Sequence, residues 1–185
     1  MSVSGEWFSP KNLEFQKIKG RGPTEWTTFS LSDSMGITGE GEITFTQLSG
    51  SVAPVVARLA NKLRGNKITS DNDVLTLNNL TDINLKENML LASAVSGLRC
   101  AVTDALARAS NLSMASYIRA LGGEKTSHPS KITLYANINR SMLPDDNGVK
   151  DRSPESFAKT AKKAEQEGFN TIKCAPFDEC TPPYE

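Results

Sequence analysis

Residues 12–45 alternate between apolar and polar side chains in three short runs separated by turn-forming residues. The runs are residues 13–18, 26–31 and 41–45, and the alternation is clearest in the first two. A period of two residues is typical of a strand with one face on a core. Residues 20–23 and 33–36 carry the Gly, Pro, Asp and Ser of turns. The pattern predicts an antiparallel three-stranded meander.

A helical period of about 3.6 residues replaces the alternation after residue 50. One predicted helix presents apolar residues on one face and ends at Gly65; they are Val52, Val55, Val56, Leu59 and Leu63. Residues 66–85 indicate a short helix with loops. Residues 86–110 form the longest helical stretch, and its many alanines and glycines let a helix approach its neighbours closely. Ser113 is a cap for a further helix that Gly122 and Gly123 close.

A second pattern follows residues 124–130, which read as a linker. Residues 132–139 are apolar without clean alternation, as expected for a strand buried on both faces. Ser153 and Pro154 begin a helix whose buried stripe is Phe157, Ala161 and Ala164 and which Gly168 ends. Residues 169–175 then form a second strand. Strand, helix and strand make one right-handed βαβ unit with a parallel sheet.

Composition excludes some classes of function. The chain has 185 residues, of which 38% are hydrophobic and 23% charged, and 21 basic residues balance 21 acidic ones. Such a chain is globular, and its neutral charge gives no attraction to nucleic acid or to a membrane surface. No signal sequence or run of 18 apolar residues is present, which predicts a cytoplasmic protein. Three unpaired cysteines and one histidine argue against a zinc site or a Ser-His-Asp triad.

Four local motifs in this order resemble the enolase superfamily, in its mandelate racemase and muconate lactonizing enzyme branch. They are residues 36–42 (GITGEGE), 101–108 (AVTDALAR), 117–123 (YIRALGG) and 167–173 (EGFNTIK). The resemblance covers residues 13–177. It implies an α+β capping domain at 1–125, made of the meander and a helical layer. Residues 126–185 would be the start of a (β/α) TIM-type barrel that stops, incomplete, after its second strand.

In that superfamily two loops of the capping domain close over the substrate. The matching loops here are residues 20–23 and 46–49. The resemblance makes Arg21, Thr46 and Gln47 candidate substrate-binding residues, because an arginine fork or an amide can hold a carboxylate or hydroxyl group. Solvated loop residues remain the alternative for each.

The chemistry of the superfamily removes the proton next to a carboxylate, and Mg²⁺ stabilises the enediolate. Members usually carry Lys-x-Lys at the end of the second barrel strand; here Lys173 matches the first lysine and Ala175 replaces the second. A neighbouring ammonium lowers the pKa of a lysine from about 10.4, and here that neighbour is missing. Lys173 is therefore the candidate catalytic residue, either as the base or as a ligand for the substrate carboxylate.

Asn139 ends the first predicted barrel strand and is a further candidate for binding substrate, with capping of the strand end as the alternative. Asp178 and Glu179 are interpreted as loop carboxylates. The magnesium ligands of the superfamily lie on the third to fifth strands, so the resemblance places none of them in this chain.

The resemblance implies part of a Mg²⁺-dependent lyase that dehydrates a sugar acid or another hydroxy acid. A racemase or epimerase is the alternative within the superfamily. In full length the protein is expected to be a homo-oligomer acting on a small carboxylate, whereas this chain alone is expected to be inactive. A different class remains open: a non-catalytic module whose uncovered βα unit pairs with a partner chain.

Overall fold

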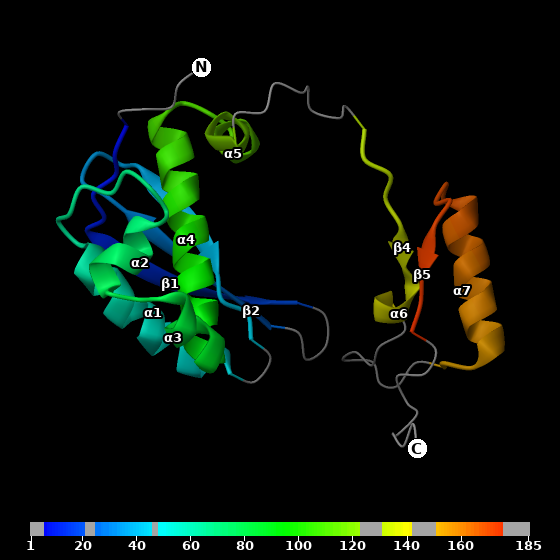
Figure 1. Ribbon diagram of the computed structural model, residues 1–185. Helices are drawn as coiled ribbons and strands as arrows, with labels where there is room; N and C mark the ends of the chain where they lie inside the picture. Colours follow the sequence, from blue (N-terminus) through cyan, green and yellow to red (C-terminus); the bar gives the residue numbers. More distant parts are fainter. Residues whose placement is uncertain (1–5, 21–24, 46–47, 123–130, 142–150, 176–185) are drawn as a thin grey trace. The chain divides into compact units, whose positions relative to one another are not determined.

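The computed structural model describes residues 6–20, 25–45, 48–122, 131–141 and 151–175 (Figure 1). The described residues fall into two compact units, with the division between residues 126 and 127. Unit 1 comprises the described residues up to 122, and unit 2 comprises those from 131 onward.

Unit 1 contains the predicted antiparallel meander, in the strand order β1, β2, β3 (Figure 1). The strands are β1 (Asn12–Lys19), β2 (Glu25–Ser32) and β3 (Thr38–Glu42). Phe29 and Leu31 of β2 point into the core and are each 1% exposed. The alternation of apolar and polar residues therefore predicted which face of β2 is buried.

The third strand begins and ends earlier than predicted. Asp33 closes the preceding turn, because its Oδ1 accepts hydrogen bonds from the backbone N–H groups of Met35 and Ile37 at 2.8 and 3.0 Å. Pairing with β2 then starts at Thr38. The prediction of 41–45 followed the apolar Ile43 and Phe45 and overlooked Gly39, which has no side chain to give a signal.

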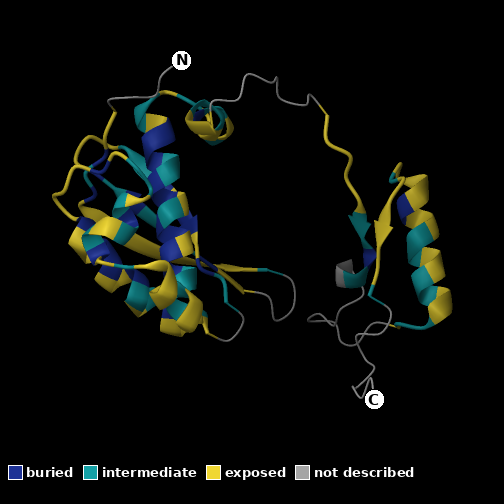
Figure 2. Cartoon of the chain, in the orientation of Figure 1, coloured by how far each residue is buried: buried dark blue, intermediate teal, exposed yellow. Residues whose placement is uncertain are grey.

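Five helices complete unit 1. They are α1 (Ser49–Leu63), α2 (Asp73–Asn78), α3 (Asp82–Glu87), α4 (Met89–Ala109) and α5 (Met114–Gly122). Ser113 caps α5 as predicted, since its Oγ accepts a hydrogen bond from the N–H of Ser116 at 3.2 Å. Helix α4 has the length and hydropathy of a membrane span, a weak sign that core helices also give. Its apolar residues include a buried face, dark blue in Figure 2.

Helix α4 lies against β3 at a distance that only glycine permits. A Cβ atom added to Gly39 would overlap the carbonyl oxygen of Ala101 and lie 2.8 Å from the Cβ of Ala105. A Cβ atom on Gly97 would lie 2.9 Å from the carbonyl oxygen of Glu42. The backbone N–H of Glu40 also donates to Asp104 Oδ2 at 3.0 Å. The motif at 36–42 therefore contacts the motif at 101–108, because the first contains β3 and the second lies in α4.

Unit 2 is a small parallel strand pair with helices. It contains β4 (Ala136–Asn137), α6 (Ile138–Ser141), α7 (Pro154–Gln166) and β5 (Ile172–Lys173). Strand, helix and parallel strand follow in the predicted order, although β5 is shorter than the strand predicted at 169–175. The strand predicted at 132–139 is wrong in extent, because residues 131–135 are exposed outside any strand and residues 138 and 139 are helical. With β5 as its one partner among the described residues, β4 lacks the second neighbour that would bury both faces.

Candidate functional site

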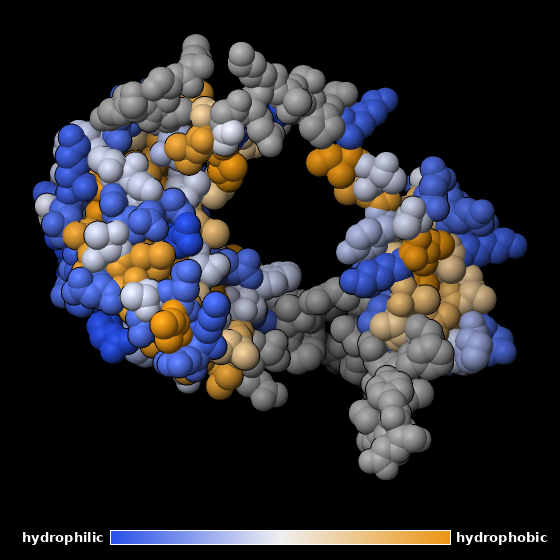
Figure 3. All heavy atoms as spheres, in the orientation of Figure 1, coloured by the Kyte–Doolittle hydropathy of each residue, from blue (hydrophilic) through white to orange (hydrophobic). Residues whose placement is uncertain are grey.

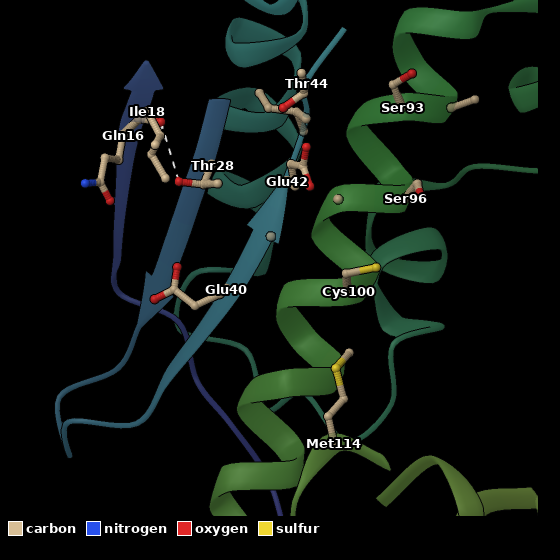
Figure 4. A pocket seen from close by; sticks show the side chains of 14 residues that line it. Gln16, Ile18, Thr28, Glu40, Glu42, Thr44, Ser93, Ser96, Cys100 and Met114 are labelled. Atoms are coloured by element: carbon tan, nitrogen blue, oxygen red, sulfur yellow. Dashed lines mark hydrogen bonds between the residues drawn. The ribbon is translucent and has the colours of Figure 1, made fainter. Parts of the chain in front are cut away.

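One candidate place for a ligand in the described residues is a groove in unit 1. It has a volume of about 950 Å³ and lies between the outer face of the sheet and α4. Figure 4 shows Gln16, Thr28, Glu40 and Glu42 on the strands; on α4 it shows Ser93, Ser96 and Cys100. Glu40 and Cys100 point away from each other in this view. These two side chains therefore do not converge on one reacting atom.

Another candidate place is the carboxyl end of the strand pair in unit 2. Ala136 is aligned with Ile172 and Asn137 with Lys173, in parallel register. The N–H of Ala136 donates to the carbonyl oxygen of Thr171 at 2.9 Å. Because the strands are parallel, both carboxyl ends lie at the same edge. In α/β architectures this edge is where ligands bind.

Lys173 is the last residue of β5, and its side chain is exposed. Its Nζ lies 5.7 Å from the centre of the Tyr135 ring. The face of an aromatic ring is negative and attracts an ammonium group. Its strand partner Asn137 has a buried side-chain oxygen that accepts no hydrogen bond from the described residues. A cation and an acceptor therefore lie on neighbouring strands at this edge.

Arg152 connects the segments that follow the two strands. Its Nη2 donates to Asn139 Oδ1 at 2.9 Å and to the carbonyl oxygen of Ala175 at 3.1 Å. The Arg152 Cζ also lies 5.0 Å from the centre of the Phe157 ring, on the first turns of α7. One guanidinium group thus contacts a residue after β4, a residue after β5 and the intervening helix.

The start of α7 holds Arg152 in place. Ser153 caps the helix, since its Oγ accepts a hydrogen bond from the N–H of Ser156 at 3.2 Å. Asp151 accepts from the N–H of Ser153 at 2.9 Å and from its Oγ at 3.1 Å. Hydrogen bonds from the backbone and then the side chain of Ser153 lower the pKa of Asp151. A charged carboxylate and a capped helix therefore flank Arg152.

The predicted site residues have different outcomes. Lys173 lies at a strand end as expected, although its role stays a prediction. Asn139 was expected to end a strand; it lies in α6 instead, where it accepts from Arg152. Arg21, Thr46 and Gln47 lie outside the described residues, as do Asp178 and Glu179. The described residues contain no cluster of three His, Cys, Asp or Glu side chains that could bind a metal.

Sequence reasoning missed Arg152 and Tyr135. The Ser-Pro cap beside Arg152 was visible in the sequence, and an arginine directly before a helix at a strand edge is a usable signal. The bonds of Arg152 join residues 139, 152 and 175, and no periodic pattern relates positions so far apart. Tyr135 was read only as one apolar residue of a strand.

Comparisons with solved structures give the fold. An enolase from the environmental genome sequencing of the Sargasso Sea is 16% identical with a TM-score of 0.67, over 94% of this chain and 44% of that one. A mandelate racemase/muconate lactonizing enzyme from Bordetella bronchiseptica RB50 is 20% identical with a TM-score of 0.61, over 91% and 43%. An enolase from Agrobacterium radiobacter, provisionally a galactarate dehydratase, was solved with Na and L-malate. It is 18% identical with a TM-score of 0.58, over 91% and 38%.

No protein family defined by sequence and no curated protein matches this chain. The solved structures nevertheless confirm the predicted resemblance to the enolase superfamily at the level of the fold. The chain spans less than half the length of these structures. Activity, substrate and partners of the whole protein therefore remain to be proposed.

Proposed function

We propose that this chain is part of an enolase-superfamily enzyme that removes the proton next to the carboxylate of a small acid. Dehydration of a sugar acid or another hydroxy acid is the proposed reaction, in the cytoplasm and in a homo-oligomer; racemisation or epimerisation is the alternative. The observation that carries the proposal is the placement of Lys173 at the carboxyl end of β5, in a fold shared with such enzymes.

The surroundings of Lys173 favour one of its two open roles. A base must be a neutral amine, whereas the face of the Tyr135 ring attracts the ammonium form. Ala175 also contributes no second ammonium on the same strand, which is one means of neutralising a lysine. We therefore assign Lys173 to binding the substrate carboxylate as a cation. Another residue of the complete protein would carry the proton.

Magnesium does not fit the described residues, because they contain no cluster of ligating side chains. Its ligands are proposed to lie elsewhere in the complete protein, as the resemblance implies. The described residues of unit 2 bind and position the acid in this proposal, and none of these steps needs the metal.

The test is an assay of the protein with all that its reading frame encodes beyond Glu185. Incubation in D₂O with Mg²⁺ and a panel of hydroxy acids and sugar acids should either replace the α-proton of the acid by deuterium or consume the acid with loss of water, and NMR detects both outcomes. The products then separate dehydration from racemisation. Absence of both α-proton exchange and dehydrated product with every acid would remove the proposal.

Variants of Lys173 separate its two roles. If it binds the carboxylate, Lys173→Ala raises KM more than it lowers kcat, and Lys173→Arg restores part of the affinity because the charge remains. If it is the base, both variants lose kcat, since arginine does not deprotonate. Lys163→Ala is the matched control, because that lysine lies on α7 in an exposed ion pair with Glu167.

A non-catalytic binding module is the second candidate, and one observation favours it. Unit 2 exposes large apolar side chains, with Ile132 76% and Leu134 68% exposed. Figure 3 shows such hydrophobic residues in orange at the surface of this unit. A reading frame that ends at Glu185, a protein without α-proton exchange and a stable complex with a partner chain would together favour this candidate.

A further inference from the structure

We propose that Arg152 is a positioning residue that clamps the ends of the two parallel strands and so fixes Lys173 against Tyr135. The strand-end clamp is defined as Arg152 with its acceptors Asn139 and Ala175. Its consequence for substrate binding rests on the function proposed above, whereas its structural effect can be measured without any substrate.

The clamp acts where the strand pair itself is weakest. Each strand is two residues long in the structure, so the ladder offers few hydrogen bonds to hold the register. An isolated two-stranded pair of this kind is marginal in water. Bonds outside the ladder must therefore fix the strand ends.

Arg152 makes such bonds on both sides. Its Nη2 reaches Asn139, two residues after β4, and Ala175, two residues after β5, at 2.9 and 3.1 Å. Hydrogen bonds from a charged donor are stronger than those between neutral groups. Shared between the two segments, this nitrogen ties one strand end to the other.

The guanidinium is itself held by α7. It lies over the Phe157 ring, and its neighbour Ser153 caps the helix. A residue fixed to the helix start has few conformations to lose when it binds the strand ends, so little entropy opposes the contact. Helix α7 thus serves as the support from which Arg152 reaches both strands.

Lys173 lies two residues before the clamped carbonyl of Ala175. If the strand end slides or frays, the backbone of Lys173 turns and its Nζ leaves the ring of Tyr135. Arg152 thereby positions Lys173.

The test uses the whole chain and the NMR signal of Lys173. The side-chain amine is labelled by reductive methylation with ¹³C-formaldehyde, and its signal is assigned with Lys173→Arg. Proximity to Tyr135 moves the signal upfield, and Tyr135→Leu defines the value without the ring. Arg152→Met keeps an apolar stem against Phe157 and removes the donors.

In Arg152→Met we expect the Lys173 signal to move most of the way to its value in Tyr135→Leu, while the amide signals of α7 persist. Arg152→Lys should recover part of the shift, because the bonds to Asn139 and Ala175 both come from one nitrogen and an ammonium can donate to two acceptors. Lys163→Met, on the exposed face of α7, should leave the signal in place. An unchanged signal in Arg152→Met would overturn the proposal.

A second variant decides the case in which Arg152→Met also loses the α7 signals. Asn139→Ala removes one acceptor of the clamp and leaves the helix cap intact. A partial shift of the Lys173 signal in Asn139→Ala supports the clamp, whereas no shift shows that Arg152 only stabilises α7 and overturns it. Neither result depends on the proposed enzyme function, so a failure of that function would not change the outcome of this test.

Discussion

The two units of the chain are stabilised in different ways. Unit 1 has a continuous core of buried side chains that joins β2, α1 and α4, and its largest members include Phe29, Leu63 and Leu98. In the described part of unit 2 the buried hydrophobic residues are Ile138 and Ala164. Figure 2 shows the same contrast, with dark blue along α4 and mostly teal and yellow along α7. Burial of apolar area therefore stabilises unit 1, whereas unit 2 depends on a helix cap and the bonds of one arginine.

The largest effect should come from Phe29, which is fully buried in β2. Phe29→Ala removes its ring and should destabilise unit 1 by about 3–5 kcal/mol. Both tryptophans of the chain, Trp7 and Trp26, lie in unit 1, so urea unfolding followed by tryptophan fluorescence reports on this unit. Phe157→Ala in unit 2 is the matched control and should leave that transition unchanged. A shift of equal size in both variants would contradict this prediction.

A smaller effect should follow from adding a side chain where β3 lies directly against α4. Gly39→Ala places a Cβ against the backbone of Ala101, which cannot move aside, and should cost about 1–3 kcal/mol. Gly50→Ala is the control, because a Cβ there meets nothing within 4 Å. We expect Gly50→Ala to be neutral or stabilising in the same urea experiment, since alanine favours a helix. Equal midpoints for the two variants would contradict the close contact.

In unit 2 a smaller loss should follow from removing the cap of α7. Ser153→Ala removes the acceptor for the N–H of Ser156 and should destabilise the helix by about 1 kcal/mol. Hydrogen exchange of the α7 amides should speed up accordingly, while exchange of the α4 amides stays the same. Lys159→Ala, at an exposed position of the same helix, provides the comparison. Faster exchange in α4 as well would mean that the units unfold together.

The smallest effect concerns alkaline pH. Burial and then the negative charge of Asp71 raise the pKa of Tyr117 above its usual 10.0. The unfolded chain loses this proton first, so the stability that Tyr117 contributes is complete below pH 10 and decreases as pH rises through its folded pKa. Tyr117→Phe should flatten the loss of unit 1 stability above pH 10 in urea titrations. Tyr135→Phe, an exposed tyrosine of unit 2, should leave the profile unchanged.

The long helices of both units and strands β1 and β2 were predicted to within a few residues, whereas residues 66–85 hold two short helices in place of the one predicted, and α6 was not predicted. Apolar residues at helical spacing and caps such as Ser113 and Ser153 place helices to within a few residues, because the signals are local. Strand β3 was misplaced because its glycines are needed for contact with α4, and that contact lies outside the strand. Strand β4 was predicted too long because an apolar run resembles a strand buried on both faces, whereas burial depends on neighbours.

The site was predictable only in part. Lys173 was found because the motif 167–173 resembles a known pattern, and its position at a strand end follows from that pattern. Arg152 and Tyr135 contact residues far away along the chain, since the chain's path in space brings residues next to β4, α7 and β5 together. A sequence read along one element at a time cannot indicate such a combination.

The hydrogen bond between Asp104 and the backbone of Glu40 bears on self-association. A free sheet edge can add strands from other molecules and so begin an aggregate. In β3 the backbone N–H of Glu40 already donates a hydrogen bond to the Asp104 carboxylate of α4, so it cannot pair with another strand. Strand β1 forms the other edge of this sheet, and it carries Lys19, a charged residue of the kind that discourages pairing at a sheet edge. Solutions of unit 1 should therefore resist growth of β-type aggregates from either side of the sheet.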